Sequence, residues 1–232
     1  MKQLSFSQIG IITGLLMAMT ATVTAQDNNL TLDDIFATPK LTGTTPSVPA
    51  WATNSKHFAF SWSEPGNSGR GLWVAKSDGN DLRLVSDKES ASVRDMVWAD
   101  ANTIISLRGN HLWQTRLRQG EDLELMSVAA DAHNLSISPK GNQLAYISNS
   151  DLWFADFNTK KNHQLTKIGI ENLSNLGKGR YSRPEREIGP GIWSGPTYKW
   201  SPDGKTIAFH AVDRREMPKV PFPNYLAAET NP

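Results

Sequence analysis

The chain has 232 residues, of which 24 are Lys or Arg and 23 are Asp or Glu, so its net charge is close to zero. It lacks the excess of basic residues that a nucleic-acid-binding face usually needs, and we expect no nucleic-acid partner. The sequence contains no cysteine, which excludes disulfides, thiol catalysis and thiolate-bound metals. The length suffices for one large all-β domain, or for part of one.

Residues 1–25 have the pattern of a signal peptide. Lys2 gives a positive start, an apolar stretch follows, and small residues end at Ala25. The stretch is short for a membrane span and polar sequence follows it at once, although an uncleaved anchor is the alternative. We therefore expect cleavage before Gln26 and no membrane attachment afterwards. Because an exported protein without disulfides suits the bacterial envelope, we expect a periplasmic or extracellular location.

The dipeptide Leu-Trp recurs with a constant spacing of 40 residues, at Leu72-Trp73, Leu112-Trp113 and Leu152-Trp153. A period of about 40 residues indicates an array in which one small unit repeats and stacks on its neighbours. Because the three tryptophans occupy a repeated position, we expect them to pack between neighbouring sheets rather than to line a site.

Each repeat contains four short runs that are rich in β-branched and aromatic residues and bounded by Gly, Pro, Asn or Asp, which predicts four strands. Four strands per unit at this period predict an all-β fold, a partial β-propeller of about three and a half four-stranded blades. After a lead-in segment at 26–47, we expect blades at about 48–88, 93–130, 133–167 and, partially, 197–232.

The repeat breaks between the third and fourth units. The Ser-Pro turns at Ser138 and Ser201 lie 63 residues apart instead of 40, which places an insertion at 168–196. Insertions in repeat proteins map to loops on one face, often the binding face. Within it, residues 184–187 (Pro-Glu-Arg-Glu) are compatible with one helical turn. Such a turn would point Glu185 and Glu187 in different directions. The alternative is a solvated loop in which Arg183 and Arg186 pair with the two glutamates.

Residues 198–209, with the sequence Tyr-Lys-Trp-Ser-Pro-Asp-Gly-Lys-Thr-Ile-Ala-Phe, resemble a propeller blade of dipeptidyl peptidase IV, in the prolyl oligopeptidase clan. The segments 213–218 and 221–226 and the acidic opening at 32–36 are similar to the same family. The specific part of the resemblance covers about residues 181–226, because the Ser-Pro-Asp-Gly turn recurs in many periplasmic propellers.

The resemblance implies a site. In that family a pair of glutamates in the insertion before this blade binds the free N-terminal amine of a peptide, so that two residues are removed at a time. Charge-assisted hydrogen bonds from an ammonium group to two carboxylates can define where a substrate ends. In this sequence the pair falls on Glu185 and Glu187, with Arg186 between them, whereas the family usually has consecutive glutamates after an aromatic residue.

The resemblance also implies that substrate binding and catalysis belong to different domains. The catalytic Ser, Asp and His of the family lie on a C-terminal α/β-hydrolase domain whose nucleophile elbow reads G-x-S-x-G. No G-x-S-x-G occurs here, so we expect an N-terminal propeller fragment without catalytic residues, inactive alone, whose parent is a serine-type dipeptidyl peptidase. The five histidines lack metal-ligand spacing, and we expect neither a metal nor a cofactor. The implied partners are peptide substrates, the missing hydrolase domain and a second copy of the parent.

A second hypothesis is a non-catalytic periplasmic propeller that binds protein partners, as Tol-type envelope proteins do. The Ser-Pro turns fit this hypothesis equally well, but residues 217–226 do not. In either case, three and a half blades would leave an apolar sheet face exposed. We therefore expect the isolated chain to be oligomeric or poorly soluble.

Overall fold

The computed structural model describes most of the repeat region and a short segment before it. The described residues are 30–37, 41, 43–65, 67, 69–86, 91–173, 184–189 and 197–217, with the backbone alone at 170–173. The proposed signal peptide and residues 218–232 lie outside them. The chain divides into a unit that ends at Thr42 and a unit that begins at Gly43.

The first unit contains helix α2 (Leu32–Phe36), in the segment that was singled out as an acidic opening. The Thr31 hydroxyl accepts a hydrogen bond from the Asp34 N–H at 3.2 Å, and the Asp34 carboxylate accepts one from the Thr31 N–H at 2.9 Å. This reciprocal capping box satisfies two backbone donors that the first turn of a helix leaves without partners. None of the helix residues is buried.

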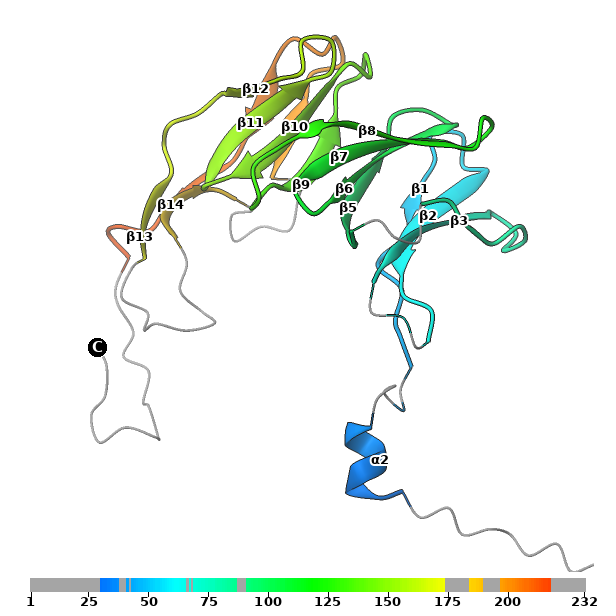
Figure 1. The fold of residues 1–232 in the computed structure, drawn as a ribbon. Helices are drawn as coiled ribbons and strands as arrows, with labels where there is room; N and C mark the ends of the chain where they lie inside the picture. Colours follow the sequence, from blue (N-terminus) through cyan, green and yellow to red (C-terminus); the bar gives the residue numbers. More distant parts are fainter. Residues whose placement is uncertain are drawn as a thin grey trace, which may run out of the picture. The chain divides into compact units, whose positions relative to one another are not determined.

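The second unit begins with three antiparallel sheets of four strands each, and in every sheet the strands pair in chain order (Figure 1). The strands of the three sheets are β1 (Ala50–Trp51), β2 (His57–Trp62), β3 (Gly71–Lys76) and β4 (Arg83–Leu84); β5 (Val93–Trp98), β6 (Thr103–Arg108), β7 (His111–Arg116) and β8 (Glu121–Ser127); and β9 (His133–Ile137), β10 (Gln143–Ser148), β11 (Asp151–Asp156) and β12 (Lys161–Gln164). The expected four-stranded units are therefore present.

The fourth repeat differs from the first three. Strands β15 (Tyr198–Trp200) and β16 (Ile207–Phe209) form a sheet of two strands. The insertion contributes β13 (Ile170–Leu173) and β14 (Pro184–Ile188), which form a separate sheet with β17 (Ala211–Asp213) in the order β13-β14-β17. The helical turn considered for residues 184–187 is therefore wrong, because this segment is an extended strand paired on both sides.

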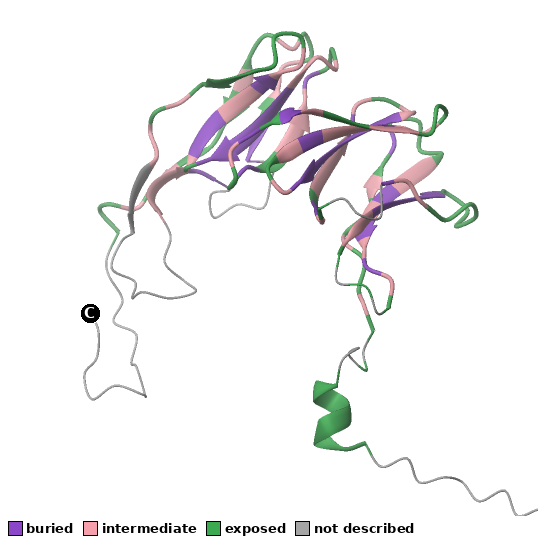
Figure 2. Cartoon of the chain, in the orientation of Figure 1, coloured by how far each residue is buried: buried purple, intermediate pink, exposed green. Residues whose placement is uncertain are grey.

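The Leu of each Leu-Trp dipeptide is the centre of a junction between two sheets. Leu72, Leu112 and Leu152 are at most 1% exposed. Leu72 clusters with apolar residues of the second sheet, Leu112 with residues of the third, and Leu152 with Tyr198 of β15. Figure 2 shows the buried residues concentrated on the strands of these sheets. Full burial of one such side chain stabilises by about 1.5–3 kcal/mol.

The three tryptophans of the Leu-Trp dipeptides are buried less uniformly than the three leucines. Trp153 packs against the cluster between the second and third sheets, as expected. Trp73 is buried, but its ring lies 5.2 Å from that of Trp62 in its own sheet. Trp113 is half-buried, and the guanidinium carbon of Arg108 lies 4.9 Å from its ring centroid. The tryptophan at the end of a sheet's first strand makes a further link that the sequence did not reveal. Trp98 Nε1 donates to the Ala50 carbonyl of the preceding sheet at 2.9 Å, and Trp200 Nε1 donates to the Ser136 carbonyl at 3.1 Å.

A buried ion pair within the second sheet gives a first test of the fold. The Arg108 side chain is fully buried, and its two terminal nitrogens donate to the Asp122 carboxylate at 2.6 and 2.8 Å. Asp122→Ala leaves this guanidinium buried without its carboxylate, so we expect the free energy of unfolding to fall by about 3–5 kcal/mol. Urea denaturation followed by tryptophan fluorescence measures the loss.

Glu121→Ala is the matched control, because Glu121 pairs with Arg116 at 3.1 Å while both side chains are more than 40% exposed. An exposed pair of this kind contributes about 0–1 kcal/mol. Equal losses in the two variants would contradict the structural role of the buried pair.

Candidate functional site

The strand conformation of β14 brings the two candidate glutamates onto one face. Successive side chains of a strand point to opposite sides, so Glu185 and Glu187 share a face, with their Cα atoms about 6.7 Å apart. Ile188 points the other way and is buried in the cluster between the third sheet and β15. The pair therefore lies on the side of β14 that does not carry this core residue.

Arg214, the residue that follows strand β17, lies on the same face as the two glutamates. In the β14–β17 register Glu187 is opposite Val212, and the Arg214 N–H donates to the Glu185 carbonyl at 2.7 Å. The Arg214 guanidinium contacts Glu187 Oε1 at 2.7 Å and donates to the Pro184 carbonyl at 3.1 Å. Because the Arg214 and Glu187 side chains are only 13% and 19% exposed, this contact fixes the Glu187 carboxylate in place.

Gly189 leaves space for the Glu187 side chain to fold back over the backbone. A Cβ atom at this glycine would lie 3.2 Å from both Cγ and Cδ of Glu187. That distance is shorter than an ordinary van der Waals contact, so a larger residue here would require the Glu187 side chain to shift by a few tenths of an ångström. Gly189 and Arg214 are therefore positioning residues for Glu187, and the sequence pattern alone identified neither of them.

The other charged side chains next to Glu185 and Glu187 pair with one another on the opposite face of the sheet of β13, β14 and β17. Arg186 Nε lies 3.2 Å from an Asp213 carboxylate oxygen, so Arg186 does not pair with either glutamate as the loop alternative required. Arg215 contacts the same carboxylate at 2.6 Å, and its hydrogen bonds lower the pKa of Asp213 to about 2. Arg183 lies outside the described residues.

Glu187 is paired with Arg214, and Arg215 lies within electrostatic reach of the Glu185 carboxylate. Within the described part of the chain, Glu185 makes no ion pair, and Arg214 contacts Oε1 of Glu187, which leaves Oε2 able to accept. This arrangement suits a small cation with several N–H donors. No group of three or more His, Cys, Asp or Glu side chains that could hold a metal ion is present in the described ranges.

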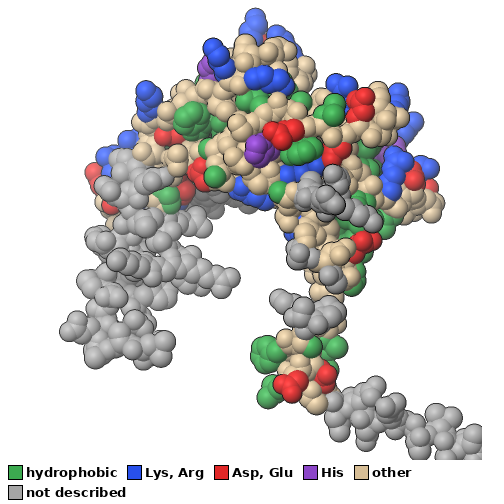
Figure 3. All heavy atoms as spheres, in the orientation of Figure 1, with side chains coloured by type: hydrophobic (Ala, Val, Ile, Leu, Met, Phe, Trp, Pro, Cys, Tyr) green, Lys and Arg blue, Asp and Glu red, His purple; other side chains and the backbone are tan. Residues whose placement is uncertain are grey.

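On the face shown in Figure 3, Lys and Arg side chains are spread along the edge of the sheets, with acidic side chains among them. His111 pairs with Glu124 at 2.8 Å, and the His163 ring stacks on Phe154. These two histidines therefore have ordinary structural contacts.

Comparisons with known proteins agree with the repeat architecture. Residues 94–232 match the family model described as dipeptidyl peptidase IV (DPP IV) N-terminal region, so the family resemblance seen in the sequence is confirmed. An oligogalacturonate lyase in complex with manganese has a TM-score of 0.52 and 16% identity, over 71% of this chain and 44% of that one. This likeness concerns the fold alone, and it confirms the partial β-propeller.

Two further solved structures are similar at lower scores. An oligogalacturonate lyase from Vibrio parahaemolyticus has a TM-score of 0.49 and 14% identity, over 71% of this chain and 45% of that one. A putative TolB from Agrobacterium tumefaciens has a TM-score of 0.47 and 13% identity, over 73% of this chain and 55% of that one. The chain thus spans less than half the length of either lyase. None of the helices described is long and apolar enough to cross a membrane.

The contact between Arg214 and Glu187 can be measured by a double-mutant cycle. Arg214→Met removes the cation from a largely buried carboxylate, and a hydrogen bond to a charged group contributes about 1.5–3 kcal/mol. We expect a coupling energy of that size between Arg214→Met and Glu187→Gln in urea denaturation. Arg215→Met, at an exposed arginine, is the control and should change stability little. A coupling energy near zero would show that the pair does not fix Glu187.

Proposed function

Because the chain belongs to the dipeptidyl peptidase IV N-terminal region family, we propose that it is the propeller part of an exported serine-type dipeptidyl peptidase. In this role it binds peptide substrates by their N-terminus and controls their access to a hydrolase domain, which supplies the catalytic residues. Peptides and the hydrolase domain are then its partners, together with a second copy of the parent enzyme.

The observation that supports this proposal best is the placement of Glu185 and Glu187 on one face of β14, with Glu187 held by Arg214 at 2.7 Å. A peptide N-terminus is an ammonium group with three N–H donors. The Glu185 carboxylate and Oε2 of Glu187 can accept two of them. Arg214 pairs with Glu187, whereas Glu185 makes no ion pair among the described residues and is therefore the acceptor that a peptide ammonium group would contact first. The site would hold the N-terminus of a bound peptide in one position. This position determines how many residues separate the N-terminus from the peptide bond that is cleaved.

Peptide binding to the chain itself tests the proposal. We expect a fluorescently labelled hexapeptide with a free amine to bind at pH 7, and its N-acetylated form to bind at least about tenfold more weakly, a loss of roughly 1.4 kcal/mol. Glu185→Gln and Glu187→Gln should each weaken binding of the free peptide. Glu64→Gln, a half-buried glutamate between β2 and β3, is the control. Mass spectrometry of the same mixtures should show intact peptide, because the chain has no G-x-S-x-G nucleophile.

The pH dependence follows from the ligand. An N-terminal amine has a pKa of about 7.7–8.0 and loses its positive charge above that range. Binding should therefore decrease between about pH 7 and pH 9. Equal binding of the free and acetylated peptides would contradict recognition of the amine and would favour the non-catalytic binding module instead.

Export is the second part of the proposal, and it rests on residues 1–25, which lie outside the described residues. The expression of the full chain in a bacterium, followed by fractionation and N-terminal sequencing, tests it. We expect a periplasmic or secreted product that begins at Gln26. A product that keeps Met1 and stays with the cytoplasm would rule out cleavage at this position.

A further inference from the structure

The turn between β10 and β11 contacts the insertion at two places. Asn149 and Ser150, the two central residues of the turn, have φ angles of 49° and 64°, as a type I′ hairpin turn requires. The Ser150 carbonyl accepts a hydrogen bond at 2.8 Å from the N–H of Ile188, the last residue of β14. Where the insertion begins, Gly169 lies so close to the turn that a Cβ atom on it would be 2.7 Å from the Asn149 carbonyl oxygen. The insertion is therefore closed at its base against this one turn.

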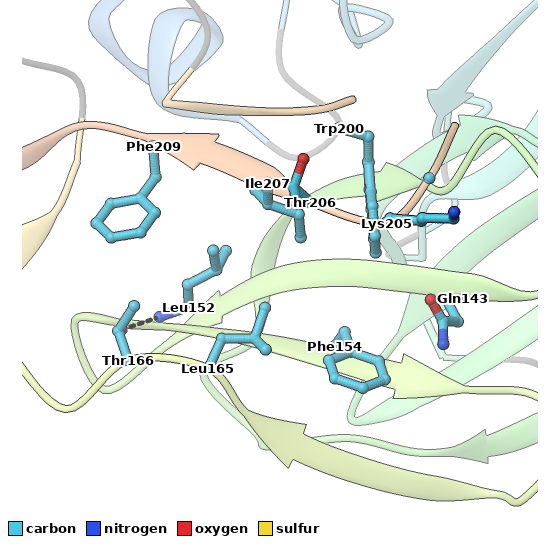
Figure 4. Close-up of a pocket in the computed structure, with 11 residues that line it drawn as sticks. Gln143, Leu152, Phe154, Leu165, Thr166, Trp200, Lys205, Thr206, Ile207 and Phe209 are labelled. Atoms are coloured by element: carbon cyan, nitrogen blue, oxygen red, sulfur yellow. Dashed lines mark hydrogen bonds between the residues drawn. The ribbon is translucent and has the colours of Figure 1, made fainter. Parts of the chain in front are cut away.

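The carboxylate of Asp151, the residue that follows this turn, holds the start of the insertion. Its Oδ1 accepts hydrogen bonds from the Ile168 N–H at 2.8 Å and from the Gly169 N–H at 3.1 Å. The Thr166 hydroxyl donates to the same oxygen at 2.7 Å and accepts from the Leu152 N–H at 2.9 Å, as Figure 4 shows for the second of these bonds. Hydrogen bonds to a carboxylate are roughly twice as strong as those between neutral groups. This carboxylate therefore restrains the backbone where the insertion begins more firmly than a neutral side chain would.

Among the three regular repeats, only the one that precedes the insertion has this aspartate. The residue before Leu-Trp is Gly71 in the first repeat, His111 in the second and Asp151 in the third. Gly71 has no side chain, and His111 pairs with Glu124 within its own sheet. Asp151 is only 6% exposed, and the two backbone N–H groups that donate to it lie beyond the four strands of its sheet. Its burial and its partners therefore indicate a role in placing the insertion.

The path from Asp151 to the acidic pair is short. Gly169 is followed by Ile170, the first residue of β13, whose backbone pairs with Arg186 of β14. Arg186 is the residue between the two candidate glutamates. Since β14 pairs with β13 on one side and with β17 on the other, the position of β13 helps to set the distance between the glutamates and the arginine that follows β17.

We propose that Asp151 is a positioning residue of the amine site. Its carboxylate fixes the start of β13, and the pairing of β13 with β14 then keeps Glu187 in contact with Arg214 and Glu185 beside it on the same face. That the placed carboxylates bind a peptide rests on the proposed function, whereas their placement can be measured without a peptide.

The contact between Arg214 and Glu187 reports this placement. Asp151→Asn keeps the size of the side chain but removes its charge and puts an NH₂ group among partners that are all donors. In this background we expect the coupling energy between Arg214→Met and Glu187→Gln, measured by urea denaturation, to be lost. Gly169→Ala tests the same place without a change of charge, because its Cβ has no room beside the Asn149 carbonyl. It should cause the same loss.

Peptide binding gives the second readout. In the parent chain the hexapeptide with a free amine should bind at least about tenfold more tightly than its N-acetylated form. In Asp151→Asn and in Gly169→Ala this ratio should approach one, because only the free peptide uses the two carboxylates. Binding of the acetylated form should stay as it is in the parent chain.

Two control variants separate these effects from a general loss of stability. Asp95→Asn alters a carboxylate that accepts a hydrogen bond from the Leu135 N–H at 2.9 Å, across the junction of the second and third sheets. Gly69→Ala adds a methyl group whose carbon would lie 3.9 Å from the Ser92 hydroxyl, which is an ordinary van der Waals contact. Both variants should keep the coupling energy and the ratio of the two affinities.

The proposal is overturned if Asp151→Asn and Gly169→Ala keep the coupling energy of the parent chain, or if they lose it while the ratio of affinities is unchanged. An equal loss of coupling in Asp95→Asn also overturns it, because the effect would then follow stability. A coupling energy near zero in the parent chain does so as well, since there is then no fixed contact to position. If the parent chain binds both peptides equally, the proposed function fails, and the coupling energy alone decides whether Asp151 places the pair.

Discussion

The four-stranded sheets of this protein carry apolar residues that are buried only where a neighbouring sheet covers them. A four-stranded antiparallel sheet cannot bury both faces alone, so stacking of successive repeats supplies the core. Leu72, Leu112 and Leu152 lie at the three successive junctions and are at most 1% exposed. The placement of the insertion strand β14 also depends on this stacking, because its Ile188 packs in the third junction.

The candidate site depends on the last of these junctions. Ile188 is 2% exposed and packs in the cluster that contains Leu152 and Tyr198, and its N–H donates to the Ser150 carbonyl at 2.8 Å. This anchor fixes which face of β14 is turned to the core. By strand alternation, Glu185 and Glu187 must then lie on the other face. The core and the acidic pair are two sides of one short strand, so a charged site can sit beside an apolar junction without burying its carboxylates completely.

The repeat architecture could be predicted from the sequence because its signals are local and periodic. Each Leu-Trp dipeptide and each Ser-Pro turn lies within one repeat, and the longer interval between Ser138 and Ser201 located the insertion. The conformation of β14 could not be predicted in the same way. A segment with three charged residues and a proline has weak strand propensity. It is a strand because β17, more than twenty residues later, pairs with it. The contact of Arg214 with Glu187 depends on that pairing and was missed for the same reason.

The interruption of the repeat adds a strand with carboxylates beside the third junction, and among the described residues the fourth sheet has only β15 and β16. The central claim is that a repeat position is buried only where the third strand of its sheet is present. Amide hydrogen exchange of the free chain, measured by NMR, tests this claim most directly at Tyr146 and Phe209, which occupy equivalent positions. The amide of Tyr146 should exchange orders of magnitude more slowly than that of Phe209. Equal protection of the two amides would show that the edge of β16 is already covered, and would contradict the claim.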